Sequence, residues 1–272
     1  EVMTRISQRA HELVAEQYRL LNEELLPALA VEGIHLLRRS EWSPKQRTWA
    51  TAYFREQIAP LLSPVALDPK HPFPTVVNKA LTFVVHLDGT DAFGRTARVA
   101  VVQVPRVLPR ILPMPSSGRG DRLDYVLISS MIHAHVDELF PGLTVRSCHQ
   151  FRITRDSDLW VDEEEMVDLM DAVKGQLAGR RYGDAVRLEV ADNCPPEIAD
   201  LLLEYAGLDA EDLYQVNGPV NMYRLGYLIN ELDRDDLKWP PFNGSVPLRR
   251  EEPDSVLRVI GRRDVLLHHP YE

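Results

Sequence analysis

The residues of this sequence best suited to chemistry are its arginines. The chain has 26 arginines and 5 lysines, and a planar guanidinium group can bind a carboxylate or a phosphate through two parallel hydrogen bonds. Most of the arginine pairs stand in predicted loops or at element ends: Arg106 with Arg110, Arg119 with Arg122, Arg180 with Arg181, Arg249 with Arg250, and Arg262 with Arg263. Such side chains can converge on an anion. The arginines can also be explained without an anion, by salt bridges with local acids and by a coding preference for arginine.

The histidines are the next candidates. His268 and His269 are adjacent near the end of the sequence, and neighbouring side chains of a strand point to opposite faces, so only one could touch a ligand. A nucleophilic histidine also needs a group that orients it and donors for the group it attacks, which the nearby residues do not supply. His133 and His135 would lie about 200° apart on a helix. We therefore predict neither a catalytic histidine nor a metal site.

An acidic run, "DSDLWVDEEE", is the remaining candidate, because clustered carboxylates can hold Mg²⁺. Asp162, however, precedes a predicted helix over residues 163–179, and Glu165 completes a capping box with it. Acids in a first turn also complement the helix dipole, so we favour capping. The sequence has no GxxxxGK[ST], HExxH or GxSxG motif. The residues alone thus give no complete catalytic constellation.

Composition narrows the class of protein. The net charge of −10 argues against general attraction to nucleic acid, and no basic stripe with interleaved aromatics predicts RNA binding. No run of eighteen apolar residues predicts a membrane span, and the first ten residues lack a signal-peptide pattern. Cys148 and Cys194 have no CxxC spacing, so we expect free thiols in a reducing cytoplasm.

Helices dominate the first part of the predicted structure. Apolar residues recur at helical spacing over residues 2–30, where Pro27 should kink or end the helix. A second helix begins at "SPKQ", with Ser43 as cap, Pro44 at the first position and Gln46 completing a capping box. The turn-rich segment 67–80 reads as an ordered loop.

Strands follow. Residues 81–87 and 96–104 predict an antiparallel pair joined through Asp88–Gly89, and residues 105–122 should pass over the surface. The later elements are expected in this order: a strand running into a helix over 124–140, strands over 148–156 and 185–191, and helices over 195–208 and 222–232. We predict an α+β fold, in which an N-terminal helical segment precedes a mostly antiparallel sheet covered by helices.

Five stretches of the chain, in the same order, resemble the bacterial polyphosphate kinase family: "LNEELLPALAVEGI", "YFREQIAPLLSPVALDPKHPFPTVVNKALTFVV", "FRITRD", "LYQVNGPVN" and "RDVLLHHPYE". The likeness extends over essentially the whole chain. It implies the end of an N-terminal helical domain in residues 1–40, an α+β head domain in 41–247, and a linker in 248–272 that leads to catalytic domains outside the chain.

The resemblance also implies a function. The family transfers the terminal phosphate of ATP reversibly to inorganic polyphosphate through a phosphohistidine, with Mg²⁺, and its catalytic residues match no position here. This region is expected to support dimerisation and the polyphosphate path, in the cytoplasm or peripherally at the inner membrane. The predicted polyphosphate contacts are Arg152, Arg155, Arg262 and Arg263. The alternative is a non-catalytic protein-interaction module without an anion site.

Overall fold

The structure is a computed structural model that describes residues 2–67, 73–89, 98–116, 122–156 and 183–241, with Gly261. The chain divides into two compact units, residues 1–227 and 228–272. The strands among the described residues and the candidate sites below belong to the first unit. The expected domain limits at residues 40 and 247 stay predictions.

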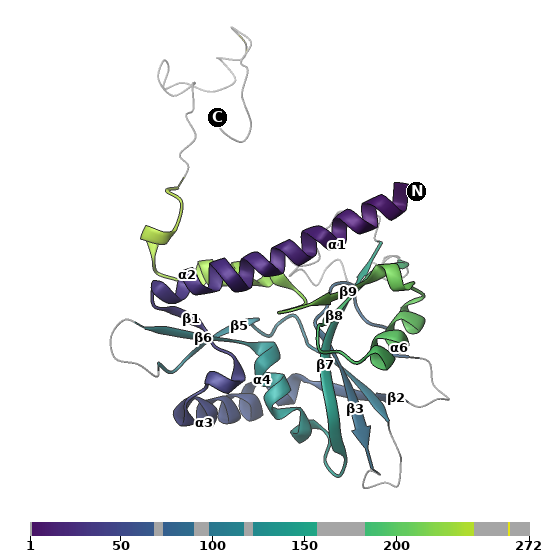
Figure 1. Ribbon diagram of the computed structural model, residues 1–272. Helices are drawn as coiled ribbons and strands as arrows, with labels where there is room; N and C mark the ends of the chain where they lie inside the picture. Colours follow the sequence, from purple (N-terminus) through teal and green to yellow (C-terminus); the bar gives the residue numbers. More distant parts are fainter. Residues whose placement is uncertain are drawn as a thin grey trace. The chain divides into compact units, whose positions relative to one another are not determined.

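A long helical run opens the chain, as predicted. It consists of α1 (Val2–Leu20), a π-helical turn at Leu21–Leu25 and α2 (Leu26–Val31). Pro27 lies in the first turn of α2 and does not end the run. Proline lacks the N–H that an α-helix needs, and the wider π-helical turn lies directly ahead of it. Figure 1 shows α1 as one long helix at the N-terminal end.

The capping signal at residue 43 is confirmed. Helix α3 (Pro44–Tyr53) begins after Ser43, whose hydroxyl accepts a hydrogen bond from the Gln46 backbone N–H at 3.3 Å. The Gln46 side chain in turn accepts from the Ser43 N–H at 2.9 Å. The helix continues as a π-helical turn, Phe54–Ile58, and a 3₁₀ turn, Ala59–Leu61.

The larger sheet has six strands in the order β2-β4-β3-β7-β8-β9. Their bounds are β2 (Ser63–Leu67), β3 (Thr82–Asp88), β4 (Val99–Gln103), β7 (Thr144–Arg155), β8 (Ala185–Ala191) and β9 (Leu213–Val216). The expected β3–β4 hairpin is confirmed, with Val84 opposite Val101. Every neighbouring pair is antiparallel except β8 and β9, which run parallel.

A smaller sheet has the order β1-β6-β5, with bounds β1 (Ile34–Leu36), β6 (Leu123–Leu127) and β5 (Ile111–Met114). The expectation that residues 105–122 pass over the surface is wrong for β5, because Ile111, Leu112 and Met114 are buried. Pro113 hides the strand in the sequence, yet β5 is an edge strand, where a missing backbone donor is tolerated.

The remaining helices follow strands or turns. They are α4 (Ile128–His135), which extends β6 directly, α6 (Pro196–Ala206) and the short α7 (Gly226–Glu231). Gly207 ends α6 in the left-handed conformation, with φ 65°, as its place in the sequence predicts. The expected last helix starts as a 3₁₀ turn, Met222–Leu225. The helix expected over 163–179 and its caps, Asp162 and Glu165, lie outside the described residues.

Two hydrophobic cores lie on opposite faces of the six-stranded sheet. Along β3, Phe83 and Val85 belong to one core while Val84 belongs to the other, as the period of two in a strand requires. Figure 1 shows α3 and α4 on one side of this sheet and α6 on the other. The α+β fold with a mostly antiparallel sheet is therefore confirmed. In the described ranges, no helix is both long enough and apolar enough to cross a membrane.

Candidate functional site

Strand β7 carries both arginines that the sequence nominated within the described residues. Arg152 forms an ion pair with Glu189 on β8, with 2.5 Å between Nε and Oε2. Glu189 is only 3% exposed and also pairs with Arg187 at 2.6 Å. Nη1 of Arg152 donates a further hydrogen bond to Asn221 Oδ1 at 3.2 Å. The charge of Arg152 is thus shared within a triad, Arg152–Glu189–Arg187, in which the carboxylate is buried and both arginines are partly exposed.

The triad lies beside aromatic side chains that tie α1 to the sheet. The Arg187 guanidinium lies 4.0 Å from the centre of the Tyr214 ring, and His11 of α1 stacks on Tyr214 at 3.9 Å. The Tyr18 hydroxyl donates to the carbonyl of Pro219 at 2.5 Å. Burial, followed by the nearby Glu189 charge, raises the pKa of Tyr18. These contacts give the triad a structural role in holding α1 on β8 and β9.

Arg155 has different partners. Its Nε donates to the carbonyl of Val76 at 3.3 Å and its Nη1 to the carbonyl of Gly183 at 3.1 Å. Its backbone N–H donates to Asn78 Oδ1 at 2.8 Å. No carboxylate within the described ranges pairs with it. Carbonyl groups orient a guanidinium without cancelling its charge, so the described contacts leave the charge of Arg155 unneutralised.

One more cation contacts Asn78, and another is its neighbour in the chain. Its carbonyl accepts a hydrogen bond from Arg106 Nη2 at 3.1 Å, and the next residue, Lys79, is exposed. Lys79 has φ 56° and is the single non-glycine residue with positive φ in the described part of the chain. That conformation costs about 1–2 kcal/mol, and such strain gathers at functional sites. We call Asn78, Lys79, Arg106 and Arg155 the Asn78 cluster.

A cavity of about 290 Å³ lies elsewhere in the same unit, among helical residues 21–26, the connector 36–39, the start of α4, β7 and the ends of β8 and β9. Its polar side chains include Arg38, Arg39, Ser129, Ser130, His133 and Gln150. Leu21, Phe83 and Val216 are among its apolar lining residues. We call it the α4 cavity.

Three buried polar atoms on residues of the α4 cavity have no hydrogen-bond partner within the described part of the chain: His133 Nδ1, His149 Nε2 and Gln150 Oε1. Burial lowers the pKa of both histidines, and the Arg39 charge lowers that of His133 further. Both imidazoles are therefore neutral at pH 7, and each neutral ring presents one donor and one acceptor nitrogen.

His133 and His135 point in different directions, as the helix geometry predicted. His133 lines the α4 cavity, whereas His135 lies 3.0 Å from Thr51 Oγ1 and stacks on Phe54. No group of three His, Cys, Asp or Glu side chains suited to a metal ion occurs within the described segments. Arg262, Arg263, His268 and His269 lie outside the described residues.

Sequence reasoning missed Lys79 and the serines of the α4 cavity. A signal for Lys79 existed, since Asn78–Lys79 closes a proline-rich loop just before a strand, where a left-handed residue is common. Ser129 and Ser130 stand at the junction of a predicted strand and helix, where hydroxyls often meet free backbone amides.

Comparison with known proteins identifies the family. The family described as "Polyphosphate kinase middle domain" matches residues 45–228. The chain belongs to the polyphosphate kinase family. It is 48% identical over its full length to a polyphosphate kinase of Pseudomonas aeruginosa, and 49% identical to one of Neisseria meningitidis serogroup C. It covers 39% and 40% of those two proteins.

A solved structure supports the fold. The crystal structure of polyphosphate kinase from Porphyromonas gingivalis aligns with 99% of this chain and 39% of its own, with a TM-score of 0.74 and 24% identity. The present chain therefore has the fold of part of that protein. It spans about two fifths of the length of the polyphosphate kinases it matches.

Three of the stretches that carry the resemblance to polyphosphate kinases contact one another. "FRITRD" contacts "LYQVNGPVN" through the hydrogen bond of Arg152 to Asn221. It contacts the segment around "TVVNKA" through the bond of the Arg155 backbone to Asn78. Two family-like segments from distant parts of the sequence thus contact the end of β7, which is itself family-like.

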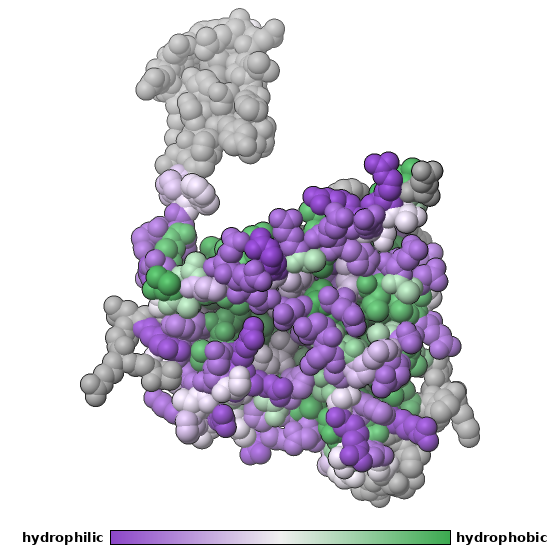
Figure 2. Space-filling model, in the orientation of Figure 1, coloured by the Kyte–Doolittle hydropathy of each residue, from purple (hydrophilic) through white to green (hydrophobic). Residues whose placement is uncertain are grey.

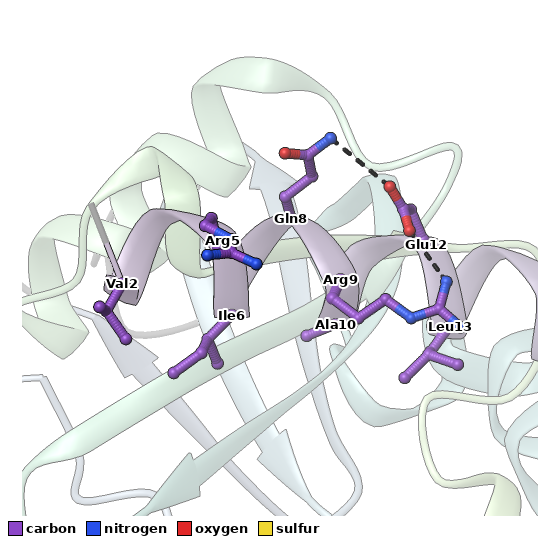
Figure 3. A pocket seen from close by; sticks show the side chains of 8 residues that line it. All are labelled: Val2, Arg5, Ile6, Gln8, Arg9, Ala10, Glu12 and Leu13. Carbon is purple, nitrogen blue, oxygen red and sulfur yellow. Dashed lines mark hydrogen bonds and ion pairs between the residues drawn. The ribbon is translucent and has the colours of Figure 1, made fainter.

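A further surface lies along the first turns of α1. Figure 3 shows Val2, Ile6 and Leu13 pointing away from the side that carries Gln8. These three apolar side chains are exposed, whereas Glu12 accepts a hydrogen bond from Gln8 and pairs with Arg9 at 2.9 Å. Polar residues cover most of the face shown in Figure 2, with apolar residues in smaller patches. The first turns of α1 thus offer apolar contact area rather than reactive groups.

Proposed function

We propose that the chain is part of an enzyme that reversibly transfers the terminal phosphate of ATP to inorganic polyphosphate through a phosphohistidine. Membership of the polyphosphate kinase family supports this, together with relatives of that name along the full chain. In this proposal Mg²⁺, ATP and the phosphorylated histidine are bound outside this chain, and the enzyme acts in the cytoplasm or peripherally at the inner membrane. The proposed domain limits remain 1–40, 41–247 and 248–272.

The part assigned to this region is a section of the polyphosphate path. The observation that carries it is the Asn78 cluster, where Arg155 is held by carbonyl groups beside Arg106 and an exposed Lys79. Polyphosphate presents a row of anionic oxygens, and charge-assisted hydrogen bonds to such oxygens are strong. Arg152 stays a predicted contact, with a smaller expected effect because Glu189 shares its charge. Arg262 and Arg263 also stay predicted contacts.

The test uses the full-length enzyme. Arg155→Gln and Lys79→Gln should each raise the KM for polyphosphate about fivefold to tenfold while leaving the KM for ATP unchanged, because each removes one contact to the phosphate chain. Arg146→Gln is the matched control, since Arg146 lies on the same strand, is exposed and already pairs with Asp88. The wild-type KM for polyphosphate should rise steeply with salt. An unchanged KM in both cluster variants contradicts the path.

The second candidate function is a non-catalytic interaction module, and it overlaps with the dimerisation that we also propose for this region. The net charge of −10 and the exposed apolar side chains of α1 support it. Ile6 is 56% exposed and Val107 is 78% exposed. If the first turns of α1 form a dimer contact, Ile6→Asp should weaken self-association in sedimentation equilibrium and Val107→Asp should not. Equal dimer strength in both variants contradicts this contact.

A further inference from the structure

The loop that presents the Asn78 cluster is attached to strand β7 on one side. The Lys79 N–H donates to the carbonyl of Ile153 at 2.8 Å, and the Asn78 side chain accepts from the Arg155 N–H at 2.8 Å. The carbonyl of Val76 accepts from Arg155 Nε at 3.3 Å. Val76 and Asn78 are 1% and 6% exposed. These contacts bury the middle of the loop and leave the Lys79 side chain exposed.

Helix α6 holds the same loop from another side through Tyr205. The Tyr205 hydroxyl donates to the carbonyl of Pro74 at 3.1 Å and accepts from the Val76 N–H at 3.4 Å. Its ring stacks on Phe73, with 3.7 Å between the ring centres. Residues 73–80 contain no helix or strand, so ladder hydrogen bonds do not fix their path. One hydroxyl, which can donate and accept at once, therefore binds two backbone groups that would otherwise follow the loop.

The conformation at the end of the loop depends on such contacts. Lys79 has φ 56°, and a residue held in a sparsely populated backbone region persists only where its surroundings fix it. The Asn78 carbonyl, which accepts from Arg106, lies in the same turn. The directions of the Lys79 side chain and of the Asn78 carbonyl therefore follow from the path that the chain takes through Val76.

We propose that Tyr205 is a positioning residue for polyphosphate, because its hydroxyl fixes the loop that presents Lys79 and orients Arg155. This inference rests on the proposed function, in which the Asn78 cluster contacts the phosphate chain. The bonds of Tyr205 go to Pro74 and Val76 rather than to a cation of the cluster, so it acts through the loop. A loop that is ordered before binding loses less conformational entropy when the anion binds, which raises affinity.

The experiment compares two tyrosine variants of the full-length enzyme. Tyr205→Phe keeps the ring that stacks on Phe73 and removes the hydroxyl. The KM for polyphosphate should rise about threefold to fivefold, while kcat and the KM for ATP should stay unchanged. Tyr18→Phe is the matched control, because its hydroxyl also donates to a proline carbonyl, that of Pro219, on α1 rather than at this loop. It should leave the KM for polyphosphate unchanged even where it lowers stability.

Two further readouts separate positioning from a general loss of stability. In the double variant Tyr205→Phe/Lys79→Gln, the rise in KM should be smaller than the product of the two single effects, because Tyr205 acts partly through Lys79. The Lys79 amide, which donates to Ile153, should exchange its hydrogen faster in Tyr205→Phe than in the wild type. Tyr18→Phe should leave that exchange rate unchanged.

The outcomes distinguish this inference from the proposed function. An unchanged KM for polyphosphate in Tyr205→Phe, with a raised KM in Arg155→Gln and Lys79→Gln, overturns the role of Tyr205 and leaves the proposed function intact. An unchanged KM in all three variants overturns both. An equal rise in KM in Tyr18→Phe, or fully multiplicative effects in the double variant, also overturns the role of Tyr205.

Discussion

Arg152 and Arg155 are three positions apart on one strand, yet their contacts give them different roles. Arg152 meets a buried carboxylate, Glu189, which a second arginine also binds. Arg155 meets only carbonyl and amide oxygens among the described residues. A carboxylate both holds and neutralises a guanidinium, whereas a carbonyl only holds it. The partner, rather than the residue type, therefore decides which arginine can serve an external anion.

The two groups of residues should also differ in whether they contribute to stability or to anion binding. The triad at Arg152 joins β7 and β8 in a buried region next to α1, and a buried charge is costly when its partner is removed. The Asn78 cluster lies at the other end of the "FRITRD" segment and includes an exposed lysine in a strained conformation. Changes at the triad should therefore act on folding, and changes at the cluster on anion binding.

The largest expected effect is at Glu189. Glu189→Gln leaves the partly buried Arg152 and Arg187 without a counter-charge, and the free energy of unfolding should fall by about 3 kcal/mol. Urea denaturation followed by circular dichroism measures it. Asp88→Asn is the matched control, because the Asp88–Arg146 pair has side chains 58% and 61% exposed, where solvent screens the pair and its loss should change stability little. Similar losses in the two variants would remove the distinction between the regions.

The next effect concerns the loop beside the triad. A Cβ at Gly218 would lie 3.0 Å from Cε1 and 3.1 Å from Cδ1 of the buried Tyr18 ring, which its hydrogen bond to Pro219 holds in place. We expect Gly218→Ala to lower the free energy of unfolding by about 1–3 kcal/mol. Gly226 starts α7 with an ordinary helical φ, and an added Cβ there would meet no described atom within 4 Å. Gly226→Ala should be neutral or stabilise by up to about 1 kcal/mol, as thermal unfolding will show.

The neutral histidines of the α4 cavity contrast with these permanent charges. Their pKa values are lowered in the folded state, so below about pH 6.5 the unfolded chain binds more protons at these positions. The stability contribution should therefore be fully present above about pH 6.5 and should be lost as the pH falls from there towards the lowered folded pKa. Urea midpoints across this range test it. His149→Gln should flatten the dependence, and an unchanged slope would exclude this histidine as a contributor.

The smallest expected effect has the opposite sign. Lys79→Gly removes the strain of a positive φ and should raise stability by up to about 1 kcal/mol. The same change removes a cation of the Asn78 cluster, so the KM of the full-length enzyme for polyphosphate should rise. Lys79→Gln removes the charge but leaves the backbone strained, so comparing the two variants separates the two effects. A destabilised Lys79→Gly would show that the lysine side chain makes a stabilising contact that outweighs the strain.

Local signals explain what the sequence predicted well. The capping box of Ser43 and Gln46, the β3–β4 hairpin and the stop at Gly207 each depend on residues close together in the chain. Strand β5 was missed because its Pro113 resembles a loop residue, and β9 because four residues carry too little pattern. The parallel pairs β1–β6 and β8–β9 join distant segments, which periodicity cannot reveal.

The candidate site was also predictable only where it depends on local sequence. The sequence nominated Arg152 and Arg155 from their segment, but it gave no means of telling them apart, because Glu189 comes from another strand and Asn78 from a distant loop. The donors of the α4 cavity arise from a helix start that only tertiary packing brings to β7. Pairing between distant residues decided both cases.

The two thiols have a practical consequence for probing these sites. Cys148 and Cys194 are each 4% exposed, and burial raises their pKa values to about 12 and about 11. Thiolate is the reactive form, so both sulfur atoms should resist maleimide at neutral pH. A fluorophore attached through Lys79→Cys would therefore label one position without any background substitution. Its emission would give an optical titration of the Asn78 cluster in the otherwise native chain.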